Sequence, residues 1–240
     1  MDLVKQIDIF GDSVMKGVQL DEKNRRYFTP KEDNADRFQR KYPISIRNSS
    51  KFGCTIEKGF GLIVKALERG SVRDMALLEY GGNDCDYDWN AVSDDPKGNH
   101  VPHTPLETFE MVYGKILRML QAKGIQPLVM TLPPIDAEKY FRWICRDGLD
   151  REAILKWLGD VQMIYRFQEL YSAAAVKMAI QTGAVVIDVR SAFLDKHNFR
   201  ELLCEDGIHP NEKGRQLIWN VLGEFAGGFL REQGAVEMMA

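Results

Sequence analysis

The segment QIDIFGDS, residues 6–13, is a short apolar run that ends in a glycine, an aspartate and a serine. Its first five residues, QIDIF (6–10), are mostly apolar on both faces, which is typical of a strand in a parallel sheet covered by helices on each side. Four further runs have the same character and predict four more strands: PISIR (43–47), MALLEY (75–80), QPLVMTL (126–132) and AVVIDV (184–189).

Helical patterns lie between these strands. In residues 105–123 apolar side chains recur at three- and four-residue spacing, and Gly124 follows as a stop signal. A second helix is predicted over 161–182, and a third is predicted to begin near Pro210, whose fixed φ suits a first helical turn. Five strand–helix alternations imply an α/β fold, a three-layer α/β/α sandwich with a five-stranded parallel sheet and right-handed crossovers.

The domain organisation is expected to be simple. The chain has 240 residues, with no internal repeat and no linker rich in Pro, Gly or Ser, so we expect a single domain over residues 1–240. Two stretches, 19–42 and 133–160, exceed the usual connection length, and such stretches are commonly lids or local helical insertions. We expect 133–160, which is rich in aromatic residues, to form a lid or a contact between subunits of a homo-oligomer.

Composition excludes several classes of function. The formal net charge of -3 gives no indication of binding to nucleic acid or to an anionic membrane. The four cysteines are far apart and form no CxxC pair, which favours isolated reduced thiols over a zinc site. No apolar run reaches the ~18 residues of a membrane helix, and no signal peptide is visible, so the sequence indicates a cytoplasmic protein without a membrane span.

Candidate functional residues follow the ends of the predicted strands, where ligands bind in open α/β sheets. Ser13 follows the first strand, Gly53 lies after the second, Asn83 lies after the third, and Asp206 and His209 come after the fifth. Each residue alone fits an ordinary turn or a helix cap, but the topology brings all five to one edge of the sheet.

Together these residues supply every group that a reaction with a serine nucleophile needs. A serine hydroxyl needs a base, and His209 is the candidate that would take the proton of Ser13. Asp206, three residues before His209, can hold the imidazole and stabilise its charged form. The backbone N–H groups of Ser13 and Gly53 and the side-chain amide of Asn83 would donate hydrogen bonds to an oxyanion.

At this point the sequence resembles a known family. GDS at 11–13, a glycine in a second block, the GGND of 81–84 and the DGIH of 206–209 look like the four blocks of the SGNH, or GDSL-type, hydrolases. The resemblance covers residues 6 to about 222. It implies a flavodoxin-like α/β/α fold and a hydrolase of esters that uses no metal and no other cofactor. It also implies Ser13 as nucleophile, His209 as base and Asp206 as its partner, with Gly53 and Asn83 in the oxyanion hole.

Rival motifs fit less well. The nucleophile elbow of α/β-hydrolases, G-x-S-x-G, would need glycine where Met15 stands, and no phosphate-binding glycine loop is present. The aspartates of YGGNDCDYDW, residues 80–89, match the first ligand positions of a calcium loop, but Trp89 replaces the glycine of its sharp turn. We therefore interpret this stretch as the lip of an active site, and the candidates for binding substrate are Asp84, Tyr87, Trp89 and His103.

The sequence thus predicts a serine esterase that removes short acyl groups, acetyl among them, from a carbohydrate or another small polar metabolite. A thioesterase, a lysophospholipase or an acyltransferase would use the same residues. Two other classes stay open at this stage: a binding module that kept the fold without turnover, and a flavodoxin-like flavin protein.

Overall fold

A five-stranded parallel sheet forms the centre of the molecule, in the order β4-β1-β5-β6-β7. The computed structural model describes residues 5–30 and 34–232, so both ends of the predicted 1–240 domain and residues 31–33 of the 19–42 stretch lie outside the described residues. The strands are β1 (Lys5–Gly11), β4 (Ile44–Asn48), β5 (Met75–Glu79), β6 (Gln126–Met130) and β7 (Val185–Ile187). The predicted five-stranded parallel sheet is confirmed, and each strand begins or ends within two residues of its expected bounds.

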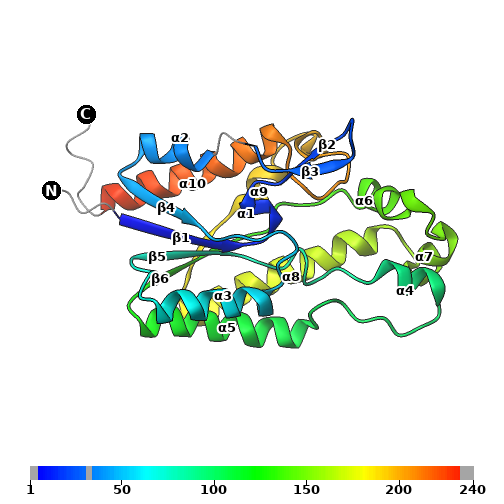
Figure 1. Cartoon of the computed structure of the whole chain (residues 1–240), viewed down its shortest axis with the longest axis horizontal. Helices are drawn as coiled ribbons and strands as arrows, with labels where there is room; N and C mark the ends of the chain where they lie inside the picture. Colours follow the sequence, from blue (N-terminus) through cyan, green and yellow to red (C-terminus); the bar gives the residue numbers. More distant parts are fainter. Residues whose placement is uncertain (1–4, 31–33, 233–240) are drawn as a thin grey trace.

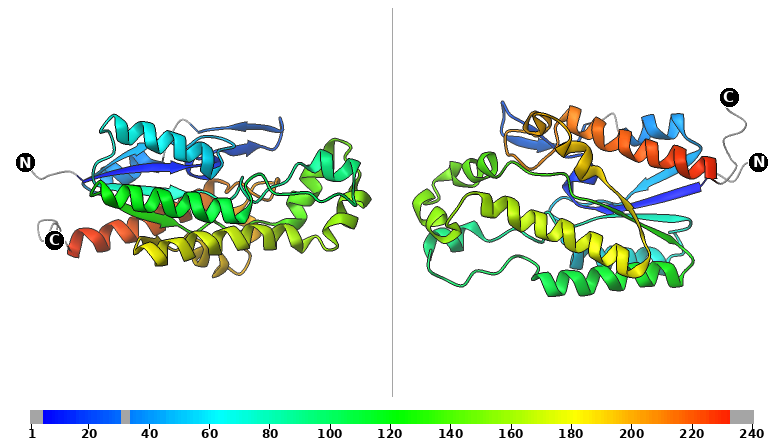
Figure 2. Two further views of the ribbon diagram at one scale, coloured as in Figure 1. Left: turned by 90° about the horizontal axis from the view of Figure 1, so that it is seen from below. Right: turned by 180° about the vertical axis from the view of Figure 1, so that it is seen from behind.

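Helices cover both faces of the sheet (Figure 1). One face carries α3 (Ile56–Glu68), α5 (Leu106–Ala122) and α8 (Gln162–Thr182). The other carries α2 (Asn34–Lys41), α9 (Val189–Leu194) and α10 (Glu212–Glu232). Figure 2 shows the long α8 and α10 crossing the sheet on opposite sides. The three-layer sandwich predicted from the alternation of elements is therefore confirmed.

The period-two alternation of each strand builds the two cores. In β5, for example, Leu77 packs toward α10 whereas Leu78 packs toward α3 and α5. Ile63 of α3 and Trp219 of α10 are buried in these separate cores. Because both sides of the central strand β5 are covered, four of its five residues are apolar.

The last helix begins later than the sequence suggested. Pro210 is paired with Leu203 in an isolated antiparallel bridge, and α10 starts at Glu212. The side chain of Asn211 accepts hydrogen bonds from the backbone N–H groups of Lys213 and Gly214, so Asn211 caps the helix. The predicted start near Pro210 is therefore correct to within two residues, and the capping Asn211 sets the first helical residue at Glu212.

Both long stretches contain regular structure. The described part of 19–42 forms a hairpin of β2 (Gln19–Asp21) and β3 (Arg26–Phe28), followed by α2. Residues 133–160 contain α6 (Ala137–Ile144), a short 3₁₀ turn η1 (Cys145–Asp147) and α7 (Arg151–Leu158). These helices lie beyond the carboxyl ends of the strands, beside α4 (Trp89–Asp94), as Figure 1 shows. The helical-insertion expectation is met, and the role of 133–160 as a lid or subunit contact stays a prediction.

The insertion has its own apolar core. Phe141, Trp143 and Ile154 are buried there against residues of α4 and α8. This third core shares partly buried residues such as Phe167 with the core beneath α5 and α8. Within the described ranges, no helix combines the length and the apolar character that crossing a membrane requires.

Candidate active site

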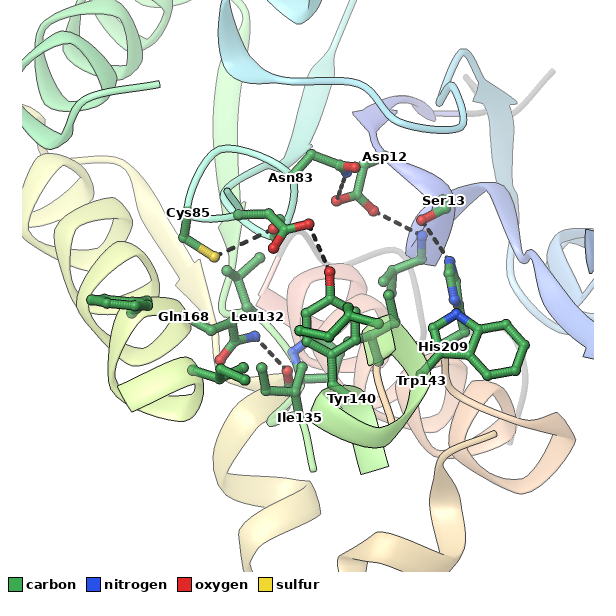
Figure 3. Close-up of a pocket in the computed structure, with 18 of the residues that line it drawn as sticks. Asp12, Ser13, Asn83, Cys85, Leu132, Ile135, Tyr140, Trp143, Gln168 and His209 are labelled. Atoms are coloured by element: carbon green, nitrogen blue, oxygen red, sulfur yellow. Dashed lines mark hydrogen bonds between the residues drawn. The ribbon is translucent and has the colours of Figure 1, made fainter. Parts of the chain in front are cut away.

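Three side chains from the two ends of the chain meet at the carboxyl edge of the sheet. The Nε2 atom of His209 lies 2.9 Å from the Oγ atom of Ser13, and its Nδ1 atom lies 2.6 Å from an Oδ atom of Asp206. All three residues are buried. Figure 3 shows Ser13 and His209 facing each other at one side of a cavity. His209 is therefore hydrogen-bonded to Ser13 on one side of its ring and to Asp206 on the other, which is the geometry that a serine nucleophile and its base require.

A tight turn positions His209. The second Oδ atom of Asp206 accepts the backbone N–H groups of Ile208 and His209, each at 3.0 Å. Burial opposes the ionisation of Asp206, but the hydrogen bonds from the His209 ring and from this turn outweigh it and hold the pKa of Asp206 below its ordinary value. Asp206 is therefore an anion that can orient the imidazole and stabilise its charged form.

Ser13 is the first residue of the short helix α1 (Ser13–Lys16), which follows β1 after the single residue Asp12. An Oδ atom of Asp12 accepts the backbone N–H of Val14 and caps this helix. The helix ends after one turn at Gly17, whose φ of +77° is a left-handed conformation that glycine adopts at little cost. The side-chain amide of Asn48, at the end of β4, donates to the backbone carbonyl of Met15 at 2.7 Å. The nucleophile therefore lies in a turn that neighbouring strands hold.

The predicted oxyanion donors lie on two loops. Asn83 follows β5 and lines the cavity, and its Nδ2 atom donates to Asp12 at 2.8 Å. An amide nitrogen carries two hydrogens, so the second N–H stays available to a ligand in that cavity. Gly53 lies in the loop after β4 with a φ of +64°, and its neighbour Phe52 lines the cavity.

Asp84 connects these two loops. It is fully buried, and its Oδ1 atom accepts the backbone N–H of Ile56 at the start of α3 at 2.9 Å. Burial raises the pKa of Asp84 to about 6. The residue therefore braces the loop that carries Asn83 against the loop that carries Gly53.

The cavity beside Ser13 has a volume of about 320 Å³. It extends from the hydroxyl of Ser13 to apolar side chains of the β6–α6 loop and of α8, as Figure 3 shows for Leu132 and Ile135. The apolar lining includes Leu132, Pro133, Ile135, Trp143, Ile144, Ile164, Phe167 and Ile208. The lining of the cavity is therefore mostly apolar, and its polar residues include Ser13, Asp86 and Gln168.

An aromatic rim surrounds the imidazole. The ring of Tyr27, from the β2–β3 hairpin, lies 4.9 Å from that of His209, and Phe52 is stacked on the imidazole at 6.1 Å with an interplanar angle of 10°. Trp143 of α6 packs edge-on to Tyr27 and carries the guanidinium of Arg146 over its ring at 3.8 Å. Phe52 is 52% exposed, so an aromatic surface borders the mouth of the cavity.

Of the four predicted substrate-binding residues, only Trp89 lines this cavity. Asp84 is enclosed as described above, and Tyr87 packs among the rings of Trp89, Trp157 and Phe167. The exposed His103 places its Nδ1 atom 3.0 Å from the backbone carbonyl of Asn83. Asp84, Tyr87 and His103 therefore do not line the cavity of Ser13. Tyr87 and His103 border a neighbouring open hollow that also includes Trp89, and their part in substrate binding stays a prediction.

The aspartates of the 84–88 stretch already accept protein hydrogen bonds. Asp86 accepts from the hydroxyl of Tyr140 and from the indole of Trp89, and Asp88 caps α4. Among the described residues, no group of three or more His, Cys, Asp or Glu side chains is arranged to hold a metal ion. These contacts give the acidic residues structural partners and disfavour the calcium-loop interpretation.

Several cavity residues were not identified from the sequence. Tyr27, Phe52 and Ile164 belong to segments without a motif, and Glu79 was assigned only to a buried strand. A charged residue inside the apolar run MALLEY was the one available signal, because strands buried on both faces rarely contain an unpaired carboxyl group.

Comparison with known proteins agrees with this geometry. The model of the GDSL-like lipase/acylhydrolase family matches residues 9–217, a span that includes all five motif residues. No curated protein matches the sequence.

Solved structures with similar folds are distant in sequence. A lipase/acylhydrolase from Enterococcus faecalis is 18% identical with a TM-score of 0.63, and the match covers 93% of this chain and 96% of that one. A variant of an acetyl-xylooligosaccharide esterase from Geobacillus stearothermophilus is 16% identical with a TM-score of 0.64, covering 95% and 97%. A GDSL-like lipase from Bacteroides thetaiotaomicron is 13% identical with a TM-score of 0.60, covering 94% and 89%. At these identities the likeness concerns the fold.

Proposed function

The chain belongs to the GDSL-like lipase/acylhydrolase family, and on this premise we propose that it is a serine esterase that forms an acyl intermediate on Ser13. The observation that carries the proposal is the unbroken line of hydrogen bonds from Asp206 through His209 to the hydroxyl of Ser13, at 2.6 and 2.9 Å. This line ends in a cavity that an ester could enter.

In the proposed first half-reaction, the Oγ atom of Ser13 attacks the ester carbonyl carbon while Nε2 of His209 takes the hydroxyl proton. The carbonyl oxygen becomes an oxyanion, which the N–H groups of Ser13, Gly53 and Asn83 stabilise. His209 then gives its proton to the departing alcohol oxygen as the bond between the carbonyl carbon and that oxygen breaks. The acyl group stays on Ser13, and the charge of Asp206 stabilises the imidazolium throughout.

In the second half-reaction, His209 takes a proton from water, and the resulting hydroxide attacks the acyl carbon. The tetrahedral intermediate collapses, the bond to Oγ breaks, and Ser13 recovers its proton from His209. An alcohol in place of water would give acyl transfer from the same intermediate. Acyltransfer is therefore the outcome to test when products are analysed.

For the substrate we propose a short acyl ester, acetyl among the candidates, of a carbohydrate or another small polar metabolite. The rim of Tyr27, Phe52 and Trp143 supports this proposal. These rings lie around the imidazole of His209, which would give its proton to the departing alcohol, and their flat apolar faces would pack against that alcohol. The structural neighbour from Geobacillus stearothermophilus is an acetyl-xylooligosaccharide esterase, and that substrate is its own.

A second candidate is a thioesterase or lysophospholipase type of hydrolase that takes a longer acyl chain. A cavity of about 320 Å³ exceeds what an acetyl group fills, and most of its lining is apolar. Burial there would stabilise an acyl chain by about 0.8 kcal/mol for each methylene group. The size and lining of the cavity favour this candidate on the acyl side.

One experiment tests both. The kcat/KM of purified protein is measured on p-nitrophenyl esters from acetate to dodecanoate, with Ser13→Ala as the inactive reference and liquid chromatography to detect acyl transfer. A maximum at acetate supports the short-acyl proposal, and a maximum at longer chains supports the second candidate. Turnover by Ser13→Ala at the wild-type rate would refute the serine mechanism.

A pair of variants of α8 locates the acyl chain. Ile164 is buried in the cavity wall, whereas Ile180 on the same helix is 72% exposed. If acyl chains occupy the apolar part, Ile164→Phe should lower kcat/KM for long esters much more than for acetate, and Ile180→Phe should change neither. Equal losses for all esters would place the acyl chain elsewhere.

A further inference from the structure

Two buried carboxyl groups, those of Asp12 and Glu79, lie beside Ser13 and are not part of the proposed triad. Asp12 is 2% exposed and Glu79 is 1% exposed. They stand at the carboxyl ends of β1 and β5, where Gly11 is the partner of Glu79 in the register of the parallel strands. Both line the cavity that contains Ser13. Two acidic groups in contact at a water-poor site need an explanation, because burying two charges together is costly.

Asp12 is the centre of this arrangement. One of its oxygens accepts the backbone N–H of Val14 at 2.8 Å, and the other accepts the amide of Asn83 at 2.8 Å. Glu79 contacts Asp12 twice: its Oε2 atom accepts the backbone N–H of Asp12 at 3.3 Å, and the two side-chain carboxyl groups are hydrogen-bonded to each other. Glu79 is therefore connected to Asn83 by hydrogen bonds through one residue, Asp12.

One proton is shared between the two acids. Both acids accept two N–H donors: Val14 and Asn83 donate to Asp12, and the backbone N–H groups of Asp12 and Met15 donate to Glu79. Burial raises the pKa of both carboxyl groups, and because that of Glu79 lies well above its ordinary value, Glu79 is the partner that keeps the proton and donates it. Burial and the adjacent charge of Asp12 raise the pKa of Glu79 well above its ordinary value. The pair then carries one negative charge, which the N–H groups of Val14 and Asn83 stabilise on Asp12.

The backbone leaves room for this contact. A Cβ atom at Gly11 would lie 3.0 Å from the Oε2 atom of Glu79 and 3.0 Å from its carbonyl oxygen. A side chain at position 11 would therefore press on the carboxyl group, and glycine in the GDS turn has a second role beside forming the turn.

We propose that Glu79 is a positioning residue that holds the carboxylate of Asp12, and through it the amide of Asn83, in the orientation that an oxyanion hole requires. This inference rests on the proposed function, since Asn83 has to donate to an oxyanion for its orientation to matter. Glu79 itself touches no reacting atom and acts on the rate through Asp12.

The arrangement makes an observable prediction for alkaline pH. Loss of the Glu79 proton would place two carboxylates side by side, push Asp12 away from Glu79 and displace the amide of Asn83. Among the described residues, the titratable groups that interact with the pair include Cys54, Tyr80, Asp84, Cys85, Tyr113 and His209. Arg146 lines the same cavity, and its guanidinium lies over the ring of Trp143.

The test compares Glu79→Gln and Glu79→Leu with the wild type by measuring kcat and KM from about pH 5 to about pH 10 on the best p-nitrophenyl ester. Glutamine keeps a donor toward Asp12 and cannot ionise, whereas leucine removes the contact. We expect Glu79→Leu to lower kcat about tenfold to a hundredfold, the range of effects that small misplacements near reacting groups produce, with KM changed less than twofold. The kcat of Glu79→Gln should be at least tenfold higher than that of Glu79→Leu. It should also not fall at alkaline pH, whereas the kcat of the wild type should.

Asp8→Asn is the matched control, because Asp8 is a fully buried acid of the same strand β1 that is paired with Arg47 away from the cavity. It should leave the pH profile unchanged. Wild-type kcat and an unshifted alkaline decline in both Glu79 variants would overturn the proposal. If Glu79→Leu does not fold, the pH profile of Glu79→Gln decides alone. If the wild type shows no Ser13-dependent turnover at all, the proposed function fails, and that outcome is distinct from an inert Glu79.

Discussion

Asn83 illustrates how one side chain can serve two partners. Its amide donates one hydrogen to Asp12, and its backbone carbonyl meets the ring of His103. The remaining N–H is the one assigned to the oxyanion under the proposed mechanism. A donor fixed in advance stabilises developing charge without reorganising during the reaction, which is why such donors contribute strongly to rate.

Asn83→Ala should lower kcat by about a hundredfold to a thousandfold, the usual cost of one oxyanion donor, with a smaller change in KM. Steady-state kinetics on the preferred ester measure this. Asn90→Ala, an exposed asparagine of α4, is the control for losing an amide near the site. A wild-type kcat in Asn83→Ala would remove this residue from the oxyanion hole.

At the scale of elements, strand ends and helix starts position the functional groups. Asn211 caps the start of α10, two residues after His209. Asp84, in the loop after β5, accepts a hydrogen bond from the backbone N–H of Ile56 at the start of α3. Neither residue touches the hydroxyl of Ser13. Both nevertheless hold loops from which the site is built.

Asn211→Ala should lower the free energy of unfolding by about 1 kcal/mol, because two backbone N–H groups at the start of α10 lose their acceptor. Asn211→Asp retains the capping oxygen but loses the hydrogen bonds that the Asn211 amide donates to the backbone carbonyls of Glu201 and Leu203, so it should restore only part of this loss. Urea denaturation gives the values. Asn220→Ala, later in the same helix and exposed, provides the reference, and equal stability of Asn211→Ala and Asn220→Ala would contradict a capping role.

The buried Asp84 predicts a change of stability with pH. Its pKa is raised from 3.8 to about 6 in the folded protein, so its contribution to stability is fully present below pH 3.8 and is lost as the pH rises through about 6. Asp84→Asn, which is neutral at every pH, should therefore gain stability relative to the wild type across this window, by about 2–3 kcal/mol. Urea denaturation at about pH 4 and about pH 7 measures the difference.

The exposed Asp94→Asn controls for removing one negative charge from the same region. A constant difference in stability between Asp84→Asn and the wild type from about pH 4 to about pH 7 would argue against a raised pKa at Asp84.

At the scale of the whole molecule, the sheet and the helical insertion share a boundary at the cavity. Ser13 and His209 come from the sheet edge, whereas Tyr140 and Trp143 come from α6. Phe167 of α8 packs against the cores on both sides of this boundary. We therefore propose that the two parts fold as one domain, as the length and composition suggested.

Tryptophan fluorescence can test this cooperativity. Trp219 packs on the sheet, and the other three of the four tryptophans, Trp89, Trp143 and Trp157, belong to the third core. In Trp219→Phe, emission therefore reports on the insertion, while far-ultraviolet circular dichroism reports on all elements. The two unfolding transitions should coincide, and a separate, earlier fluorescence transition would show that the insertion unfolds independently.

The sequence alone determined the α/β/α architecture and the positions of the five motif residues. Strand and helix periodicity are local properties, and turns after parallel strands meet at one edge of a sheet whatever the details of packing. For this reason Ser13 and His209 could be paired although they are 196 positions apart. The start of α10 was predicted to within two residues, because Pro210 and Asn211 both suit a helix start; in the structure Pro210 pairs with Leu203 and Asn211 caps the helix.

Tertiary structure alone decided the shape and lining of the cavity and the partner of Asp12. Tyr27, Phe52 and Trp143 come from three segments with no shared motif, and they meet only because the hairpin and the insertion fold over the same sheet edge. Glu79 reaches Asp12 across 67 positions through the register of two parallel strands. Contacts of this kind depend on how distant elements pack, and no local pattern of residues encodes them.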